Sequence, residues 1–262
     1  RDWACLETFP LTAWACDEWV HSIDRGDHDA LSSRDEIARA RRVLDRLGIS
    51  LIAAPEAGCC GALAHHLNDA EAGLAAARRN IDAWLPQLDA GVEAIAMTAS
   101  GCGVRVKDYG WLLRDDPAYA EKAARVAAAT KDISEILAAE RDALKALGAR
   151  AGAKRIAYHP PCTLQHGQKL AGGVEALLAD AGFELVPVAE KHLCCGSAGA
   201  YSILQPEIAG QLKTRKLGNL TAGAPELIAT ANIGCLAHLQ SGTALPVRHW
   251  VELLDEALQP RM

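Results

Sequence analysis

The sequence predicts an α/β fold made of two similar lobes, each a small parallel sheet flanked by helices. Two observations lead to this prediction. Short apolar segments typical of strands alternate with amphipathic segments typical of helices, and one block of the sequence occurs twice. A third observation indicates what the lobes carry, because the 262 residues include nine cysteines, four of them in two adjacent pairs.

The composition describes a chain that can bury a substantial core. Half of the residues are hydrophobic and 23% are charged, which excludes pervasive disorder. The formal net charge is -6 and the basic residues are scattered, which argues against a nucleic-acid-binding surface. No apolar run approaches the roughly 18 residues that a membrane-spanning helix needs. We therefore expect any link to a membrane to pass through a partner.

The internal repeat is anchored on the two cysteine pairs, at positions 59–60 and 194–195, each followed by glycine. Each pair comes after a helix-like segment that ends at a glycine, a short apolar strand and a loop. Downstream, residues 93–102 align with residues 226–235, and both read as a strand that runs into a Gly-Cys turn. Still further on, the first copy carries about 16 additional residues. Similarity over several blocks in the same order indicates a duplication.

Periodicity and capping signals predict the individual elements. Gly48 and Gly182 stand where a left-handed residue would end a helix, and Asp115-Asp116-Pro117 reads as a helix start. The join between the lobes is expected near residues 149–154. Helices are predicted at 34–47, 69–85, 117–128, 132–147, 171–181, 205–219 and 248–258, and strands at 50–54, 94–99, 154–158, 184–188 and 226–230.

Three segments follow from this map. Residues 1–33 hold three of the six tryptophans and show no sustained helical or strand period, so we expect a truncated or foreign leader that is poorly ordered. Residues 34–150 form the first lobe, which is expected to be incomplete because its opening strand is missing. Residues 151–262 form the second lobe.

In the second lobe, cysteines follow three successive predicted strands. Cys162 comes after the first strand, the pair Cys194–Cys195 after the second, and Cys235 after the third, with His238 three residues later. Because the carboxyl ends of parallel strands meet at one edge of a sheet, four thiols and an imidazole are expected together. Four thiolates suit an iron–sulfur cluster, and the same donor set also suits tetrahedral zinc.

A cysteine can also be an ordinary small hydrophobic residue in a core. This is our interpretation of Cys5 and Cys16 in the leader, whereas the second-lobe thiols stand at loop starts beside glycine or proline, which favours a ligand role. For His238 a ligand and a helix cap are both open. His159 and His192 are expected to fix loop geometry by hydrogen bonding.

The first lobe keeps a reduced set of candidate ligands. No thiol stands near residues 26–29, where the counterpart of Cys162 is expected, and Arg105 takes the place of His238. Three thiols and an arginine make a poor cluster cage, so an intact binding site is expected in the second lobe rather than here. The three thiols are Cys59, Cys60 and Cys102.

The spacing of these cysteines resembles the cysteine-rich CCG domain, which occurs twice in heterodisulfide reductase B subunits and related electron-transfer proteins. Within that superfamily the sequence resembles the iron–sulfur subunits of glycolate oxidases. The resemblance runs over roughly residues 36–258. Its main motifs are Thr98–Gly103, Val106–Gly110, Tyr158–His166, Cys194–Tyr201, Asn232–Gln240 and Pro246–Trp250.

The resemblance implies two CCG domains in tandem and a redox centre of the 4Fe-4S type. It implies an acceptor-linked oxidoreductase subunit that is not catalytic without a flavin partner. That partner would carry FAD, oxidise glycolate to glyoxylate and pass electrons through this subunit towards a quinone or another membrane acceptor. A cytoplasmic location is expected, with the inner membrane reached through partners. The implied ligands are Cys162, Cys194, Cys195 and Cys235, with Cys59, Cys60, Cys102 and His238 as further cofactor-binding residues.

The sequence differs from the family pattern in two ways, and several alternative functions remain open. Family members carry a ferredoxin-like domain with paired Cys-x-x-Cys-x-x-Cys runs, and this sequence has no such run, so we expect a fragment. The second difference is that the strand and the cysteine that should open the first lobe are expected to be missing. Lactate, glycerol 3-phosphate or a heterodisulfide could replace glycolate, and a zinc-stabilised module without redox activity is a further alternative. No dinucleotide-binding glycine motif and no hydrolase triad order are found.

Overall fold

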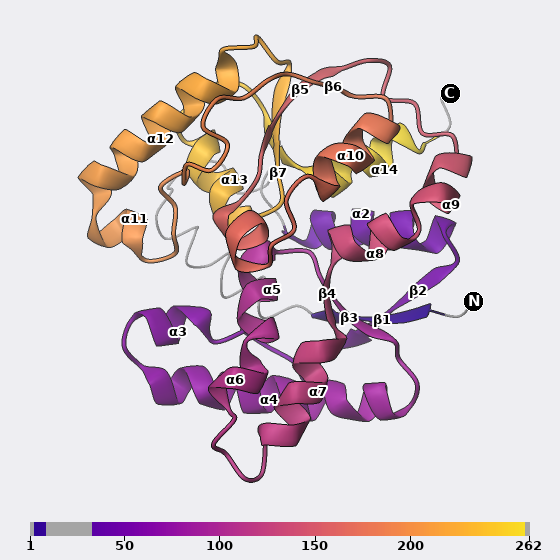
Figure 1. The fold of residues 1–262 in the computed structure, drawn as a ribbon, viewed down its shortest axis with the longest axis vertical. Coiled ribbons are helices and arrows are strands. Elements are labelled where there is room, and N and C mark those ends of the chain that lie inside the picture. The colour runs from indigo at the N-terminus through magenta and orange to yellow at the C-terminus, as the bar shows by residue number, and fades with distance from the viewer. Residues whose placement is uncertain (1–2, 9–32, 260–262) are drawn as a thin grey trace. The chain divides into compact units, whose positions relative to one another are not determined.

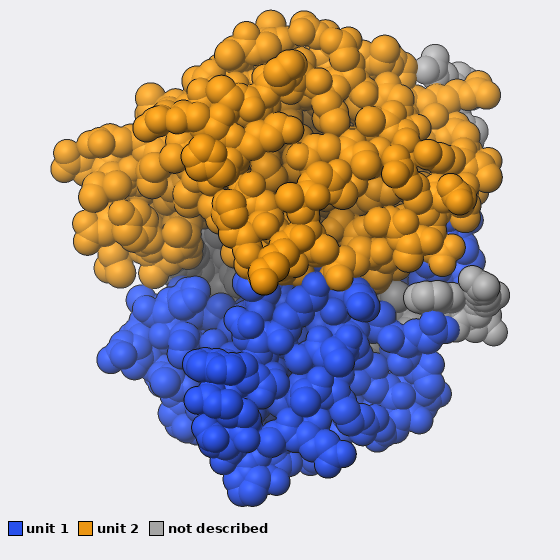
Figure 2. Space-filling view, viewed as in Figure 1, with its two compact units in different colours: residues 1–37, 44–133 blue, residues 38–43, 134–262 orange. Residues whose placement is uncertain are grey.

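The structure is a computed structural model that describes residues 3–8 and 33–259. The chain divides into two compact units, coloured separately in Figure 2. Unit 1 comprises residues 1–37 and 44–133, and unit 2 comprises residues 38–43 and 134–262. The lobe boundaries predicted from the repeat, 34–150 and 151–262, stay a prediction.

Unit 1 is built around a four-stranded parallel sheet with the order β2-β1-β3-β4 (Figure 1). The core beneath it contains the fully buried Trp84 and Tyr109, whose rings stack with centroids 6.5 Å apart. The strands are β1 Trp3–Thr8, β2 Ile49–Ala54, β3 Ala94–Met97 and β4 Thr130–Asp132, and the helices are α3 Ala62–His66, α4 Ala70–Asp89, α5 Ser100–Lys107, α6 Tyr109–Leu112 and α7 Ala120–Ala129. Helix α2, Ser33–Arg46, is divided between the units, because its residues 38–43 belong to unit 2.

Strand β1 corrects our expectation that the first lobe lacks its opening strand. It lies between β2 and β3 and runs parallel to both, with Cys5 in register with Leu51 and Ala94. The segment shows no strand period in the sequence, but a sheet without it would leave the facing edges of β2 and β3 unpaired. Cys16 and residues 26–29 lie outside the described residues.

Unit 2 has a second four-stranded parallel sheet, with the order β6-β5-β7-β8. Figure 1 shows α10 and α14 on one side of its strands and α12 and α13 on the other. The strands are β5 Arg155–His159, β6 Glu184–Leu185, β7 Leu227–Thr230 and β8 Val247–His249, and the helices are α8 Ile133–Ala139, α9 Arg141–Ala146, the π-helix η2 Thr163–Gly167, α10 Gly173–Asp180, α11 Tyr201–Leu204, α12 Pro206–Thr221, α13 Ile233–Gln240 and α14 Trp250–Ala257.

The two sheets confirm the predicted fold class of short parallel sheets flanked by helices. Both place the strand that opens the lobe second in the sheet, so the duplication extends to topology. One predicted helix, 132–147, is wrong in its extent. Thr130–Asp132 pairs with β3 as β4, and the non-helical backbone of Glu140 separates α8 from α9.

Buried apolar side chains hold the strands of unit 2 in place against the neighbouring helices. All four residues of β7 are buried, and Trp250 and Leu254 of α14 are fully covered. Each fully buried leucine or isoleucine side chain among them contributes roughly 1.5–3 kcal/mol through removal from water.

Within residues 33–259, no helix is both long and apolar enough to cross a bilayer.

Candidate metal centre

Three loops at the carboxyl edge of the second sheet carry the predicted cysteines. Strand β5 ends at His159, and Pro160-Pro161 leads from it to Cys162. The loop after β6 carries Cys194 and Cys195. Cys235 lies in the first turn of α13, directly after β7. The parallel order β6-β5-β7 therefore brings three loops from distant parts of the sequence to one edge, as expected for such sheets.

The four thiols of these loops form a continuous series of contacts. Cys162 interacts with Cys194, Cys194 with Cys195, and Cys195 with Cys235. Cys195 and Cys235 are buried, and the other two are half-buried. The seven cysteines from Cys59 to Cys235 are all free of disulfide bonds. These contacts shift the pKa values of the thiols in different directions. Cys194 raises the pKa of Cys162. Cys195, and to a lesser extent His159, lowers the pKa of Cys235 to about 6.

A glycine makes the turn after each cysteine pair, in both units. The Gly196 N–H points at Cys194 Sγ, 3.3 Å away, and the Gly61 N–H points at Cys59 Sγ, 3.5 Å away. Both glycines have positive φ, +97° and +78°. A Cβ on Gly196 would lie 2.4 Å from the Ala209 carbonyl oxygen, and one on Gly61 would lie 2.5 Å from that of Gly73. Only glycine allows this close approach of the turn to the following helix.

Lys216 of α12 holds the loop that precedes the second cysteine pair. Its side chain is fully buried, and its Nζ donates to the carbonyl oxygens of Glu190, at 2.9 Å, and Lys191, at 3.3 Å. Burial lowers the pKa of Lys216, while Cys162, Cys195 and Cys194 oppose that shift. A buried ammonium group thus stands beside the thiols and offsets negative charge on them.

The neighbouring residues of α12 bind the same loop. Arg215 and Asn219 both donate to the Glu190 carboxylate, which lowers the pKa of Glu190 to about 2, with Arg215 contributing most. Gln165 adds a further link, because its Nε2 donates to the carbonyl oxygens of Pro160 and Lys191 at 3.1 and 3.2 Å. The loops that carry Cys162 and the cysteine pair are therefore tied together by hydrogen bonds.

Helix α13 presents Cys235 and, one turn later, His238. Asn232 caps the helix, its side-chain oxygen accepting from the N–H groups of Gly234, at 2.9 Å, and Cys235, at 3.3 Å. His238 Nε2 is buried without a hydrogen-bond partner and lies 3.1 Å from where a Cβ on Gly196 would stand. Burial lowers the pKa of His238. The imidazole faces the cysteine turn, which leaves the ligand interpretation open to test.

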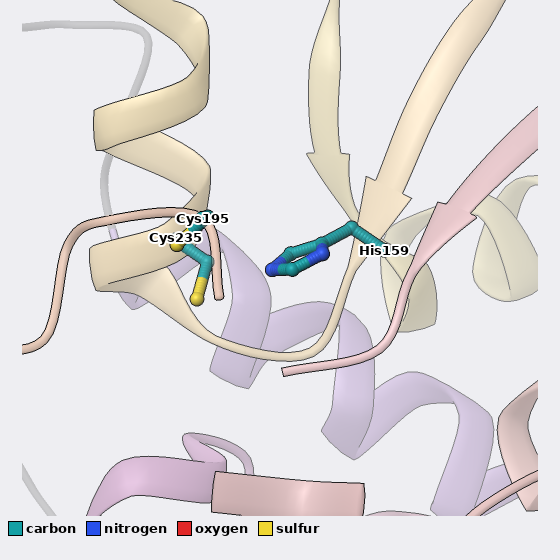
Figure 3. A group of neighbouring side chains, drawn as sticks. All are labelled: His159, Cys195 and Cys235. Atoms are coloured by element: carbon teal, nitrogen blue, oxygen red, sulfur yellow. The ribbon is translucent and has the colours of Figure 1, made fainter. Parts of the chain in front are cut away.

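His159 is the residue beside the thiols that the predicted ligand set did not include. It is fully buried, and a ring nitrogen of His159 and the Sγ atoms of Cys195 and Cys235 all lie within 4.8 Å of one another (Figure 3). Neither ring nitrogen has a partner at ordinary hydrogen-bond geometry, and Cys235 is the thiol that interacts with the ring, so the expected role in fixing loop geometry by hydrogen bonding stays a prediction. The sequence did contain a sign of this placement: His159 directly follows the predicted strand 154–158, and the end of a parallel strand lies at the carboxyl edge of the sheet.

The first cysteine pair is held by the neutral side chains of Asn80 and Tyr109, and the exposed Arg79 guanidinium also donates to the Cys59 carbonyl oxygen at 3.5 Å. Asn80 accepts from the Gly58 N–H at 2.7 Å and donates to the Cys59 carbonyl oxygen at 3.1 Å. The Tyr109 hydroxyl donates to the Cys60 carbonyl oxygen at 3.0 Å. The buried Cys60 thiol interacts with Cys102 and with Cys59, so the structure brings together the three predicted thiols of the first lobe.

The two sites carry their buried cations at different positions. The carbonyl oxygen of Gly73 lies against the turn glycine of the first site, and that of Ala209 lies against the turn glycine of the second. Asn80 and Lys216 each follow that residue by seven positions, so they correspond in the repeat. Arg105 corresponds to His238, three residues after the last cysteine. Arg105 is buried, and its Nε and Nη2 atoms have no hydrogen-bond partner. The first site thus pairs a neutral amide with a guanidinium, and the second pairs an ammonium with an imidazole.

The second site suits a metal centre with sulfur ligands. Its four thiols are in contact, Lys216 supplies a compensating positive charge, and the His159 nitrogens are buried without partners. Thiolates are the usual ligands of iron–sulfur clusters, and a sulfur and nitrogen set also fits zinc. The three-thiol set of the first unit fits such a centre less well.

Comparisons with known proteins agree with this geometry. The family profile described as CCG, cysteine-rich domain, matches residues 30–107 and 156–240, and the chain belongs to this family. Over 222 residues, 85% of the chain, it is 53% identical to the glycolate oxidase iron-sulfur subunit of Escherichia coli (strain K12), covering 54% of that protein. The predicted resemblance is thereby confirmed.

Two shorter relatives are matched over most of their length. The chain is 30% identical to the uncharacterized protein YkgE of E. coli (strain K12), over 86% of the chain and 94% of the relative. It is 28% identical to lactate utilization protein A of Shouchella clausii (strain KSM-K16), over 81% and 89%. By contrast, it spans only about half the length of the glycolate oxidase subunits that it matches.

Proposed function

We propose that this chain is part of an iron–sulfur electron-transfer subunit of a glycolate-oxidising complex. A flavin-bearing partner, with FAD, oxidises glycolate to glyoxylate, and electrons pass through this subunit towards a quinone acceptor. The complex works on the cytoplasmic side of the inner membrane, and this subunit is not catalytic without its flavin partner. The observation that carries the proposal is the contiguous set of four thiols in unit 2, in a chain 53% identical to a glycolate oxidase iron-sulfur subunit.

The residues of unit 2 have separate roles in this proposal. Cys162, Cys194, Cys195 and Cys235 hold a cluster of the 4Fe-4S type, and His238 stands next to the cysteine turn as a further candidate ligand. A bound cluster supplies one-electron transfer. Lys216 stabilises negative charge on the thiolates, and the buried position of Cys195 and Cys235 keeps water from the sulfur atoms.

The first lobe has a lesser place in the proposal. Cys59, Cys60 and Cys102 are candidate cofactor-binding residues, but three thiols beside a buried arginine do not complete a four-thiolate cage. We therefore assign the metal centre to unit 2.

A lactate-oxidising complex is the second candidate. Lactate utilization protein A matches this chain over 89% of its own length, although at only 28% identity. Glycolate and lactate differ by one methyl group, which a site on the flavin partner would have to distinguish. Rates with the two substrates, measured on the intact complex, separate these candidates. A higher catalytic efficiency with lactate would overturn the glycolate assignment.

Metal analysis decides between a redox centre and a zinc-stabilised module. The complex is purified without oxygen, and iron, acid-labile sulfide and zinc are measured together with electron paramagnetic resonance of the reduced protein. We expect iron and sulfide in equal amounts. One zinc per chain without iron would overturn the redox function.

Cys194→Ala tests the route of the electrons. Removing one of the thiols in the contact series is expected to lower the iron content and the quinone-linked rate by at least about tenfold, the scale on which metal-site changes act. The flavin partner should keep its rate with an artificial dye, because the dye accepts electrons directly from the flavin. If dye-linked and quinone-linked rates fall together, the proposed division of labour is wrong.

A further inference from the structure

His159 is a buried imidazole that the proposed ligand set leaves without a role. It ends β5, its side chain has no exposed surface, and neither Nδ1 nor Nε2 has a hydrogen-bond partner. A neutral imidazole carries one N–H donor and one acceptor nitrogen. Leaving such a group buried and unpaired is unfavourable, so the folded protein gains from a partner at this position.

Sulfur atoms are the partners within reach. A ring nitrogen of His159 and the Sγ atoms of Cys195 and Cys235 lie within 4.8 Å of one another, and Figure 3 shows the ring directed towards the two cysteines. All three residues are buried. The His159 backbone is held in place from the next strand, because Thr230 Oγ1 donates to the His159 carbonyl oxygen at 3.0 Å. The ring therefore stands at a fixed place beside the thiols.

We propose that His159 is a positioning residue whose ring N–H donates a hydrogen bond to the Cys235 thiolate sulfur and so raises the reduction potential of the centre. The inference rests on the proposed iron–sulfur function. An N–H donor stabilises the additional negative charge of the reduced state, which is how hydrogen bonds to cluster sulfurs tune potentials. The step involves no covalent change: the proton stays on nitrogen, and the transferred electron resides on the centre.

His159→Phe removes both ring nitrogens while keeping a ring of similar size. In the intact complex, we expect this variant to keep its iron and sulfide and to show a more negative midpoint potential. His159→Asn, which restores an N–H donor, should recover part of the shift. The control is His192→Phe, since His192 is an exposed histidine in the loop before the cysteine pair and should leave the potential unchanged.

A spectroscopic measurement covers the case in which His159→Phe fails to hold its centre. In the unaltered complex labelled with ¹⁵N-histidine, electron–nuclear double resonance should show a weak nitrogen coupling and a proton that exchanges in deuterated water. A strong nitrogen coupling would indicate direct ligation and overturn the donor role, as would the absence of any histidine coupling. An unchanged potential in iron-replete His159→Phe would also overturn it while leaving the proposed function intact. A complex without iron would overturn both.

Discussion

At the scale of single residues, the charge beside the thiols distinguishes the two sites. Lys216 donates to the carbonyl oxygens of the loop that leads to Cys194, whereas Asn80 makes the matching contact to the Cys59 carbonyl oxygen. Both side chains hold the loop, but only the lysine adds a positive charge. In the first site the buried positive charge is the Arg105 guanidinium, so the two sites differ in the position of the charge relative to the cysteine loop.

Lys216→Met tests this residue. The methionine fills similar space but leaves the Glu190 and Lys191 carbonyl oxygens without their donor, a loss of about 1–3 kcal/mol in the free energy of unfolding. We expect iron to be lost to a chelator several times faster than from the unaltered protein. Lys213→Met is the control, because Lys213 lies on the same helix and bonds only to the Ser241 hydroxyl among the described residues. Equal rates of iron loss in the two variants would contradict the proposed role.

At the scale of elements, short helices position the last cysteine of each site. Helix α13 begins directly after β7 and is capped by Asn232, whose side chain accepts from the Cys235 N–H itself. The cap therefore fixes the helix end and the backbone of a proposed ligand at the same time. Helix α5 carries Cys102 in the same way after β3, but its N-cap position is Ala99, which offers no side-chain cap.

Asn232→Ala should destabilise the protein and loosen the centre together. Loss of an N-cap costs about 1 kcal/mol, which unfolding in urea without oxygen can measure. Asp69→Ala removes a cap of the same kind from α4, where Asp69 accepts from the Ala72 N–H at 3.0 Å, far in sequence from the four proposed ligands of unit 2. We expect similar losses of stability in both variants but faster iron release only in Asn232→Ala. Unaltered iron release in Asn232→Ala would show that the cap has no part in holding the centre.

At the scale of the whole molecule, a duplicated fold carries two unequal sites. Both sheets are parallel and share one strand order, and both cysteine turns use a glycine pressed against the next helix. The sites differ in thiol number among the described residues and in where the buried cation stands. Duplication thus preserved the scaffold, while the ligand set of one copy diverged.

A comparison of equivalent cysteines in the two lobes tests this asymmetry. Cys235→Ala is expected to remove most of the iron assigned to these two lobes, whereas Cys102→Ala should leave it nearly unchanged. Iron per chain and the intensity of the paramagnetic signal are the measurements, made on the complex purified without oxygen. Equal losses in the two variants would indicate two working centres and contradict the assignment to unit 2 alone.

The sequence by itself determined the fold class, the duplication and the grouping of the second-lobe cysteines. Alternation of strands and helices implies parallel sheets, and parallel sheets bring the loops after their strands to one edge. The motif Cys194-Cys195-Gly196 could be placed at that edge without coordinates, because a local pattern and a general rule of topology sufficed.

Only the tertiary structure decided what depends on contacts between distant segments. Strand β1 has no periodic signal of its own, and its place follows from pairing with β2 and β3. Lys216 and His159 meet the cysteine loops through packing between residues far apart in the chain, and burial then makes their polar groups matter. The sequence shows that these residues are present. The free energy of a buried ammonium or imidazole group depends on the groups packed around it, and those groups are brought together only in the folded protein.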